Sequence, residues 1–304
     1  MKLIADIGNY STITATENSE PLVIRAVSAD ITVKSVMTAN TDVSPTVEVD
    51  GKRLILGDYA TKQKNAQTIV ERGKFEPGVV KPYLFAGLHS DFTGEVLYLI
   101  PEDDRWIKDG LYSKLIGTHE VKVNGKSYKH TFKSIKFFLE SDVAVEYAFS
   151  EGLIDTDGDC LAVDIGGGTC IYLVMTPSGQ VLHRRSIPDV GGISLCYDII
   201  NSNLMRSYKY AFKPAKVMDA IADGSLMYGR KYDFSEVYQP LLDDWFNRLI
   251  NAIQMDCRDL LSDVTTIMFL GGNANLLRDR IANQPGYYIP ENPQLTNIQA
   301  LMNL

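Results

Sequence analysis

Residues 161–175 read Leu161-Ala-Val-Asp-Ile-Gly-Gly-Gly-Thr-Cys-Ile-Tyr-Leu-Val-Met175, two apolar runs separated by an acid, three glycines and a threonine. Apolar residues alternate on both sides of the glycines, which is the period of β-strands, so the pattern predicts a β-hairpin. The turn consists of Gly166, Gly167, Gly168 and Thr169. Glycines have no Cβ, and they leave backbone N–H groups open to an anion such as a phosphate. An ordinary glycine-rich hairpin is the alternative interpretation of this stretch alone.

A second copy of the pattern lies near the N-terminus. The chain there reads Leu3-Ile-Ala-Asp-Ile-Gly-Asn-Tyr-Ser-Thr-Ile-Thr-Ala-Thr16, which predicts a strand ending in Asp6, a turn at Gly8 and Asn9, and a returning strand. The two Asp-Ile-Gly triplets lie about half a chain apart, as an internal duplication of two α/β domains would place them. Two such turns facing each other would hold one polyphosphate from both sides. Asp164, at the end of its strand, would offer a carboxylate to a hydrated divalent cation.

Composition limits the classes of function. The chain has 304 residues, 45% of them hydrophobic, and a net charge of -8, which speaks against a surface that coats nucleic acid unaided. The four cysteines form no CxxC pair, as expected of reduced thiols in a cytosolic protein. No apolar run approaches the ~18 residues of a membrane span, so we expect a cytoplasmic protein. The four histidines, His183 among them, stand apart from acids and cysteines in the sequence, which predicts no metal site or triad based on histidine.

Further elements in the first half follow from turn signals. Asp50-Gly51 and Asn124-Gly125 predict hairpins, and residues 58–72 are expected to form a helix. Residues 135–140 predict a strand that delivers Glu140 at its end, just before a helix over 143–150. A carboxylate there lies where open α/β sheets bind ligands, and it would orient an attacking water. The alternative is a helix-capping cluster that only satisfies backbone N–H groups.

Two more glycine segments occur in the second half. Gly191 and Gly192 precede a helix expected to reach about residue 204, and Gly271, Gly272 and Asn273 follow a strand and enter another helix. Glycines at such a junction bring the backbone and the positive helix N-terminus against a ribose, a base or a phosphate. Each segment alone is also compatible with an ordinary strand–helix junction. Residues 235–259 predict a long helix with an apolar stripe.

In this order and at these separations, the motifs resemble those of the actin-like ATPase superfamily, and most closely the ParM (StbA) type of plasmid-segregation actins. The tail Pro290-Glu-Asn-Pro-Gln-Leu-Thr-Asn-Ile-Gln299 is similar to the Pro-x-x-Pro-Gln-x-x-Asn ending of that type. The resemblance implies an α/β fold of two ribonuclease H-like domains with a nucleotide cleft between them. Domain I would cover 1–152, with a small inserted subdomain at about 27–130, and would be completed by a C-terminal helix within 290–304. Domain II, with the adenosine motif, would cover 153–289.

The resemblance also implies roles for single residues. Asp6 and Asp164 would hold Mg2+, and Glu140 would align the attacking water, which makes these three the expected catalytic residues. ATP, or GTP, would be the nucleotide. Its binding residues would be Gly8, Asn9, Tyr10, Ser11, Gly166, Gly167, Gly168, Thr169, Gly191, Gly192, Gly271, Gly272 and Asn273.

The implied function is a polar, two-stranded filament that hydrolyses its nucleotide slowly and separates plasmid copies through a DNA-binding adaptor protein. No direct nucleic-acid binding and no membrane binding are expected. Two departures from the family pattern stand out: Thr12, Ile13 and Thr14 occupy a strand where members commonly carry a phosphate-contacting lysine, and Asn273 replaces a frequent third glycine. A nucleotide-binding regulator that does not polymerise, and a small-molecule kinase of the same fold, are the alternatives.

Overall fold

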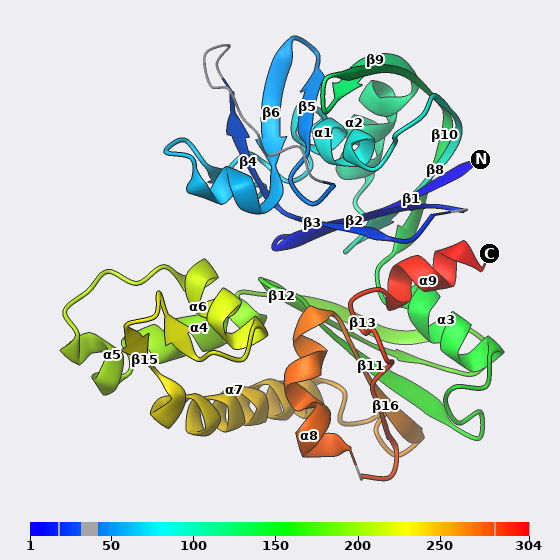
Figure 1. Cartoon of the computed structure of the whole chain (residues 1–304). Coiled ribbons are helices and arrows are strands. Elements are labelled where there is room, and N and C mark those ends of the chain that lie inside the picture. Colours follow the sequence, from blue (N-terminus) through cyan, green and yellow to red (C-terminus); the bar gives the residue numbers. More distant parts are fainter. Residues whose placement is uncertain (18, 32–41, 283, 304) are drawn as a thin grey trace. The chain divides into compact units, whose positions relative to one another are not determined.

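The computed structural model describes residues 1–17, 19–31, 42–282 and 284–303. The chain divides into two compact units, drawn in Figure 1. Unit 1 comprises Met1–Tyr147 and Leu295–Leu304, and unit 2 comprises Ala148–Gln294. Each unit contains its own β-sheet with helices packed on it, so the predicted α/β class is confirmed.

The sheet of unit 1 begins with a meander. Strand β1 pairs with β2 in antiparallel fashion and with β8 in parallel, and β8 pairs in parallel with β10. The N-terminal hairpin predicted around Gly8 and Asn9 is thereby confirmed. The order in this half is β3-β2-β1-β8-β10. The bounds are β1 (Lys2–Ile7), β2 (Ser11–Thr16), β3 (Leu22–Arg25), β8 (Phe92–Ile100) and β10 (Lys126–Leu139).

The same sheet continues as β10-β9-β5-β6-β4-β7. The range 27–130, predicted as an insertion, contributes these outer strands, but it also contains β8, which pairs with β1; residues 32–41 of it lie outside the described part. Both predicted hairpin turns are present, with positive φ at Asp50, Gly51, Asn124 and Gly125, as a type I′ turn requires. The bounds are β4 (Val27–Asp30), β5 (Thr46–Val49), β6 (Lys52–Leu56), β7 (Gln67–Thr68) and β9 (Gly117–Val123).

The helix predicted over 58–72 is wrong. That stretch forms a short 3-10 helix, η1 (Gly57–Lys62), and then β7, whose backbone pairs with β4. The helix in this region is α1 (Pro77–Ala86), which begins with a proline at its first turn and buries most of its length. Helix α2 (Arg105–Leu115) begins where the Asp104 side chain caps it by accepting from the backbone N–H groups of Trp106 and Ile107.

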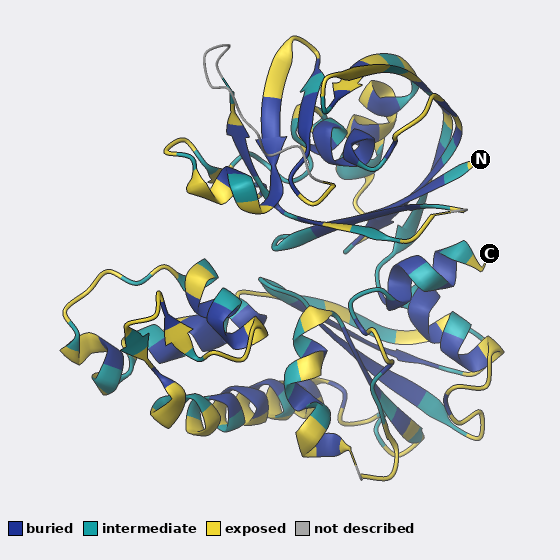
Figure 2. Ribbon diagram, viewed as in Figure 1, coloured by how far each residue is buried: buried dark blue, intermediate teal, exposed yellow. Residues whose placement is uncertain are grey.

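Helices cover both faces of the meander in unit 1. Alternate residues of β1 point to opposite faces, so Leu3 joins the core under α1 and α2, whereas Ile4 joins a second core. That second core includes Val143 of α3 (Asp142–Ser150) and Ile298 of α9 (Thr296–Met302). Figure 2 shows these elements as largely buried ribbon. The last helix of the chain thus packs on the first two strands.

Unit 2 repeats the topology of the meander. Its sheet has the order β13-β12-β11-β16-β17, again an antiparallel meander followed by parallel strands. The hairpin predicted around the three glycines is confirmed as β11 and β12. This repeat of strand order is what an internal duplication predicts. The bounds are β11 (Asp159–Ile165), β12 (Thr169–Met175), β13 (Val181–Pro188), β16 (Val264–Leu270) and β17 (Tyr287–Tyr288).

The helices of unit 2 connect β13 to β16 and follow β16. The long helix predicted over 235–259 is confirmed as α7, and the helix predicted to reach 204 is interrupted at Ser202, which has an extended backbone. After β16 the chain forms a 3-10 helix before a short α-helix. Among the described residues, no helix combines the length and apolarity needed to cross a bilayer. The bounds are α4 (Gly192–Asn201), α5 (Asn203–Ser207), α6 (Pro214–Ala222), β14 (Met227–Tyr228), β15 (Tyr232–Asp233), α7 (Ser235–Asp256), η2 (Gly272–Leu277) and α8 (Arg278–Ile281).

Candidate functional site

The three glycine segments of unit 2 meet at one turn. Gly192 N donates to the carbonyl oxygen of Gly166 at 3.1 Å, and Ile193 N donates to that of Gly167 at 2.8 Å. The Asn273 side-chain amide also donates to the Gly166 carbonyl, at 2.9 Å. The start of α4 and the segment after β16 are therefore both bonded to the hairpin turn between β11 and β12.

Close packing explains why two of these positions are glycines. A Cβ on Gly191 would lie 2.4 Å from the Gly166 carbonyl oxygen, and a Cβ on Gly192 would lie 2.4 Å from Asn273 Oδ1. Heavy atoms do not approach that closely without displacement. Asn273, placed where the family often carries a glycine, thus fills the space beside Gly192 and ties two segments together.

The carboxylate of Asp164 lies at the edge of the same cluster. Asp164 is the penultimate residue of β11 and is 9% exposed. A Cβ on Gly271 would lie 2.4 Å from Asp164 Oδ1 and 2.6 Å from the Ile165 carbonyl oxygen, and Gly271 has φ +80°. Only glycine adopts that conformation at low cost and leaves room for the carboxylate. Unit 2 therefore brings Asp164 together with the predicted residues of all three glycine segments.

The corresponding turn of unit 1 has the same local geometry. A Cβ on Gly8 would lie 2.6 Å from the Ser11 carbonyl oxygen, and a Cβ on Gly166 would lie 3.2 Å from the Thr169 carbonyl oxygen. In both turns the first glycine faces the carbonyl three residues later. Asn9 and Tyr10 lie between β1 and β2, and the Tyr10 carbonyl accepts from Ala26 N at 2.8 Å.

The two predicted carboxylates of unit 1 lie on neighbouring parts of its sheet. Asp6 of β1 is in register with Leu99 of β8, and Glu140 N donates to the Ile100 carbonyl at 2.9 Å just after β10 ends. Both carboxylates act on the buried Tyr98 of β8. Burial raises the pKa of Tyr98 well above its ordinary value, and the charges of Asp6 and Glu140 raise it further. Sequence reasoning did not single out Tyr98, because its position in an apolar strand reads as ordinary core.

Two residues of the C-terminal tail accept hydrogen bonds from predicted site segments, one from Gly271 and one from the residue that follows Glu140. In unit 2, Gly271 N donates to the Pro293 carbonyl at 3.0 Å. In unit 1, Ser141 N donates to Asn297 Oδ1 at 2.9 Å, a bond buried within the core, and Ser141 has φ +72°. Asn297 therefore fixes the backbone directly after Glu140. The sequence signal for Asn297 was the Pro-x-x-Pro-Gln-x-x-Asn pattern, which did not reveal its role.

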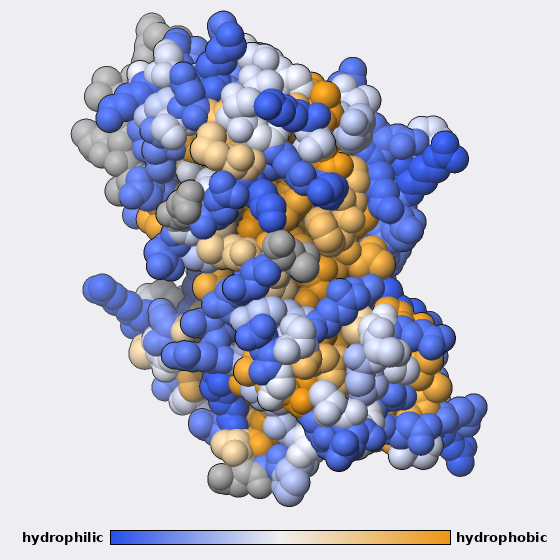
Figure 3. Space-filling model, turned by 90° about the vertical axis from the view of Figure 1, so that its right-hand side faces the viewer, coloured by the Kyte–Doolittle hydropathy of each residue, from blue (hydrophilic) through white to orange (hydrophobic). Residues whose placement is uncertain are grey.

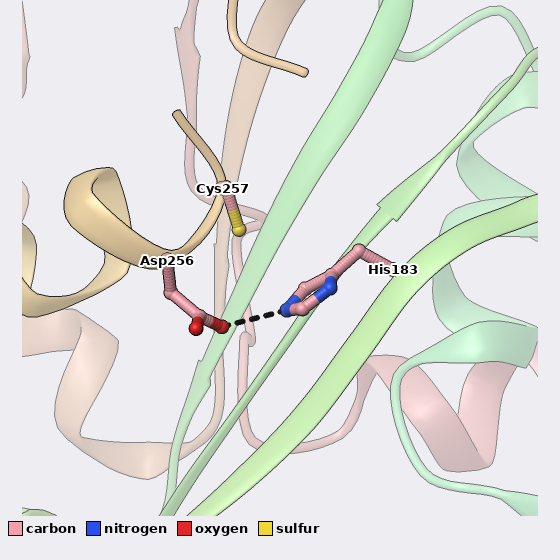
Figure 4. A group of neighbouring side chains, drawn as sticks. All are labelled: His183, Asp256 and Cys257. Carbon is pink, nitrogen blue, oxygen red and sulfur yellow. Dashed lines mark hydrogen bonds and ion pairs between the residues drawn. The ribbon is translucent and has the colours of Figure 1, made fainter. Parts of the chain in front are cut away.

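The fold brings one histidine close to an acid and a cysteine that lie far from it in the sequence. His183 of β13 lies 2.8 Å from Asp256 at the end of α7, with Cys257 beside them, as Figure 4 shows. Asp256 also accepts from the Tyr172 hydroxyl at 2.7 Å and from Arg185 at 2.9 Å. The Tyr172 hydrogen bond, followed by His183 and the Arg185 charge, lowers the pKa of Asp256.

This carboxylate is already engaged by three donors, so the cluster is an ion-pair network that joins α7 to the sheet. The partners of Asp256 are 84, 73 and 71 residues away in the sequence, which is why spacing did not reveal them.

Comparisons with known proteins agree with this architecture. Residues 162–283 match the family described as "Archaeal actin homologue MreB-like, C-terminal". No curated protein matches the sequence.

The chain is also similar in structure to several solved actin homologues. The archaeal actin homologue Ta0583, solved as a complex with ADP, has a TM-score of 0.77 at 18% identity, with 99% of this chain and 98% of that chain covered. A 15-stranded ParM filament from Clostridium botulinum has a TM-score of 0.80 at 13% identity, with 99% and 97% covered. The apo pSK41 ParM protein has a TM-score of 0.69 at 13% identity, with 99% and 95% covered. The expected two-domain architecture is therefore confirmed, and the fold of this chain is that of the solved actin homologues.

Proposed function

We propose that this chain binds a Mg2+-bound nucleoside triphosphate, ATP or GTP, hydrolyses it slowly, and polymerises into filaments. The observation that carries the proposal is the meeting of Asp164 with the three glycine segments in unit 2. Buried carboxylates suit a hydrated hard cation, and backbone turns without Cβ atoms suit phosphates. The archaeal homologue of the same fold that was solved with ADP supports a nucleotide as the ligand.

In this proposal, separate residues bind the metal, bind the phosphates and orient the attacking water. Asp6 and Asp164 hold the hydrated Mg2+, which neutralises phosphate charge when bound. The turns at Gly8–Ser11 and Gly166–Thr169 donate backbone N–H groups to the phosphates, and the segments at Gly191–Gly192 and Gly271–Asn273 position the remainder of the nucleotide. Glu140 orients the attacking water by accepting its hydrogen bond. Positioning and charge neutralisation are sufficient for phosphoryl transfer, so no covalent intermediate is required.

Assembly into filaments is the second part of the proposal. Structural similarity to a ParM filament supports self-association. We extend this to a polar, two-stranded filament in the cytoplasm that moves plasmid DNA through a DNA-binding adaptor. Domain I and domain II would correspond to units 1 and 2.

Calorimetry and sedimentation test the proposal together. Wild-type protein is expected to bind ATP or GTP only with Mg2+, and to sediment and scatter light when that nucleotide is added. Asp164→Ala is expected to lose nucleotide binding. Glu140→Ala is expected to bind and polymerise but to release phosphate at least about 100-fold more slowly, as for loss of one general base. A wild-type protein without Mg2+-dependent nucleotide affinity would refute the proposal.

A non-hydrolysing nucleotide-binding regulator is the second candidate. The observation in its favour is the second strand of the first hairpin, where buried Thr12 and Thr14 flank Ile13 and no lysine is available for the phosphates. On this alternative, wild-type and Glu140→Ala proteins would release phosphate equally slowly while both bind the nucleotide. Single-turnover phosphate release distinguishes the two.

A further inference from the structure

One end of unit 2 carries a cluster of aromatic rings. Ring centroids lie 5.1 Å apart for Tyr210 and Tyr232, 5.0 Å for Phe212 and Tyr228, and 5.1 Å for Tyr208 and Tyr232. The cluster is not closed off by other residues, because Tyr210 is 51% exposed. Tyr208, Phe212 and Tyr232 are half-buried, and Tyr228 is buried. Adjoining aromatic rings that are partly exposed are typical of sites where a partner binds.

Basic side chains surround these rings. Between residues 206 and 231 there are six lysines and arginines against two aspartates, a local excess of four positive charges in a chain whose net charge is -8. Lys216 lies over the Tyr228 ring at 5.7 Å, and Lys231 over the Tyr232 ring at 5.2 Å. We call these residues the basic aromatic surface: Arg206, Tyr208, Lys209, Tyr210, Phe212, Lys213, Lys216, Tyr228, Arg230, Lys231 and Tyr232.

These cations differ from three other cations of unit 2. Arg185, Arg248 and Arg280 are paired with aspartates. Within the described part of the chain, none of the six cations of the basic aromatic surface forms an ion pair with an acid, and all six are exposed. Their charge is therefore available to a partner.

The opposite end of unit 2 is acidic. The segment between α3 and β11 carries Glu151, Asp155 and Asp157, and β11 begins with Asp159; residues 151–159 contain no lysine or arginine. Asp263 lies next to it, because Asp159 N donates to the Asp263 carbonyl at 2.8 Å. We call these five residues the acidic end. Leu153, 45% exposed, adds an apolar side chain between the carboxylates.

The two surfaces are separated by the length of the sheet. The acidic end lies where β11 and β16 begin, whereas α4 starts at the turn where β11 ends and packs against α6, beside the basic aromatic surface. Seven residues of β11 alone span about 23 Å at ~3.3 Å per residue. Figure 1 shows α5, α6 and β15 at the left end of unit 2 and the α3–β11 segment at its right end.

We propose that the basic aromatic surface of one copy of this chain binds the acidic end of the next copy, head to tail. Complementary charges at opposite ends of one unit give a contact between different surfaces, and such contacts generate open polymers unless a rotation closes them. The aromatic rings supply contact area at low entropic cost, and the charges set the polarity. The proposal rests on the filament assembly proposed above and names the surfaces responsible.

A single-stranded nucleic acid is the competing occupant, since aromatic rings flanked by lysines also suit stacked bases and phosphates. A second copy is favoured because it accounts for both charged ends, whereas a nucleic acid accounts for one. The rest of the chain also carries an acidic excess, which opposes a polyanion and favours a basic partner surface. The face shown in Figure 3, which is the right-hand side of Figure 1, carries both hydrophilic and hydrophobic residues.

Charge reversal with complementation tests the contact. Variant A is Lys216→Glu with Lys231→Glu, and variant B is Glu151→Lys with Asp157→Lys. Each variant alone is expected to raise the critical concentration for sedimentation in Mg-ATP at least about tenfold, because like charges then face each other at every contact. Mixed in equal amounts, A and B are expected to assemble again, since A can bind only B and B only A.

A matched control carries the same charge change elsewhere. Lys64→Glu with Lys114→Glu reverses two exposed lysines of unit 1 and is expected to leave the critical concentration within about twofold of wild type. Calorimetric nucleotide binding, expected to be unchanged in A and B, shows that both variants are folded.

Each outcome separates the proposals. If wild type sediments and A and B sediment equally well, or if the mixture of A and B stays soluble, the head-to-tail contact is overturned. If wild type never sediments, the filament proposal fails and this contact falls with it. A fluorescent single-stranded oligonucleotide that binds wild type and not A, while A assembles normally, assigns the surface to nucleic acid and also overturns the contact.

Discussion

The candidate site depends on residue 192 being a glycine, which has no Cβ. A Cβ there would overlap Asn273 Oδ1, so Gly192→Ala is expected to displace Asn273 and break its 2.9 Å bond to the Gly166 carbonyl. We expect nucleotide affinity to fall at least about tenfold, roughly 1.4 kcal/mol, measured by calorimetry. Gly110→Ala in α2, where nothing lies within 4 Å, is the control and should leave affinity unchanged. Equal affinities in the two variants would contradict the role assigned to Asn273.

A second residue-scale prediction concerns His130, which is fully buried and whose ring nitrogens have no partner among the described residues. Burial lowers the pKa of its imidazole to about 4; Asp91 opposes that shift and His119 adds to it. In the unfolded chain a histidine titrates near ~6.5, so between about pH 6.5 and 4 unfolding takes up a proton. The free energy of unfolding is therefore expected to fall with decreasing pH, with a slope approaching ~1.4 kcal/mol per pH unit.

The test is urea denaturation at several pH values. His130→Phe, whose ring can stack on Phe85 as the imidazole does, is expected to remove most of this slope for unit 1. His89→Gln, at a histidine that is 47% exposed, should retain it. An unchanged slope in His130→Phe would show that other groups cause the acid sensitivity.

At the scale of elements, α9 connects the end of the chain to the Glu140 segment. Asn297→Ala removes the acceptor of the buried Ser141 N–H, which is expected to cost about 1–3 kcal/mol of stability. Because that bond fixes the backbone next to Glu140, the rate of phosphate release at saturating nucleotide is also expected to fall. Asn303→Ala, at an exposed position near the end of α9, is the control. A destabilised variant with a wild-type rate would limit Asn297 to a purely structural role.

At the scale of the whole molecule, each unit has its own sheet and core, so each is expected to unfold as a cooperative block. Scanning calorimetry should then show two transitions without nucleotide. If the proposed function holds, residues of both units would bind the nucleotide, so Mg-ATP should raise both transition temperatures. At 100 times its dissociation constant it would add about 2.7 kcal/mol of stability. Asp164→Ala should abolish both shifts, and a shift of only one transition would contradict a shared nucleotide.

The same scales separate what sequence patterns could predict from what they could not. Turns with local signals were predicted well, because Asp50-Gly51 and Asn124-Gly125 adopt positive φ through their own chemistry. The helix predicted over 58–72 failed because backbone pairing with β4, a tertiary contact, outweighed local propensity there. Helix α1 was missed because Pro77 and Pro82 obscure its pattern, although a proline is well tolerated in a first turn.

By itself, the sequence determined the two Asp-Ile-Gly hairpins and the duplicated strand order, since alternation and turn chemistry act between residues close in the chain. Only the tertiary structure placed Gly192 and Asn273 on the Gly166 carbonyl, joined Asp256 to His183, and brought Asn297 to Ser141. These contacts join residues 26 to 156 positions apart, and they form when packed sheets and helices bring distant segments together. Periodicity is a local property of the chain, and it carries no information on which distant side chains become neighbours.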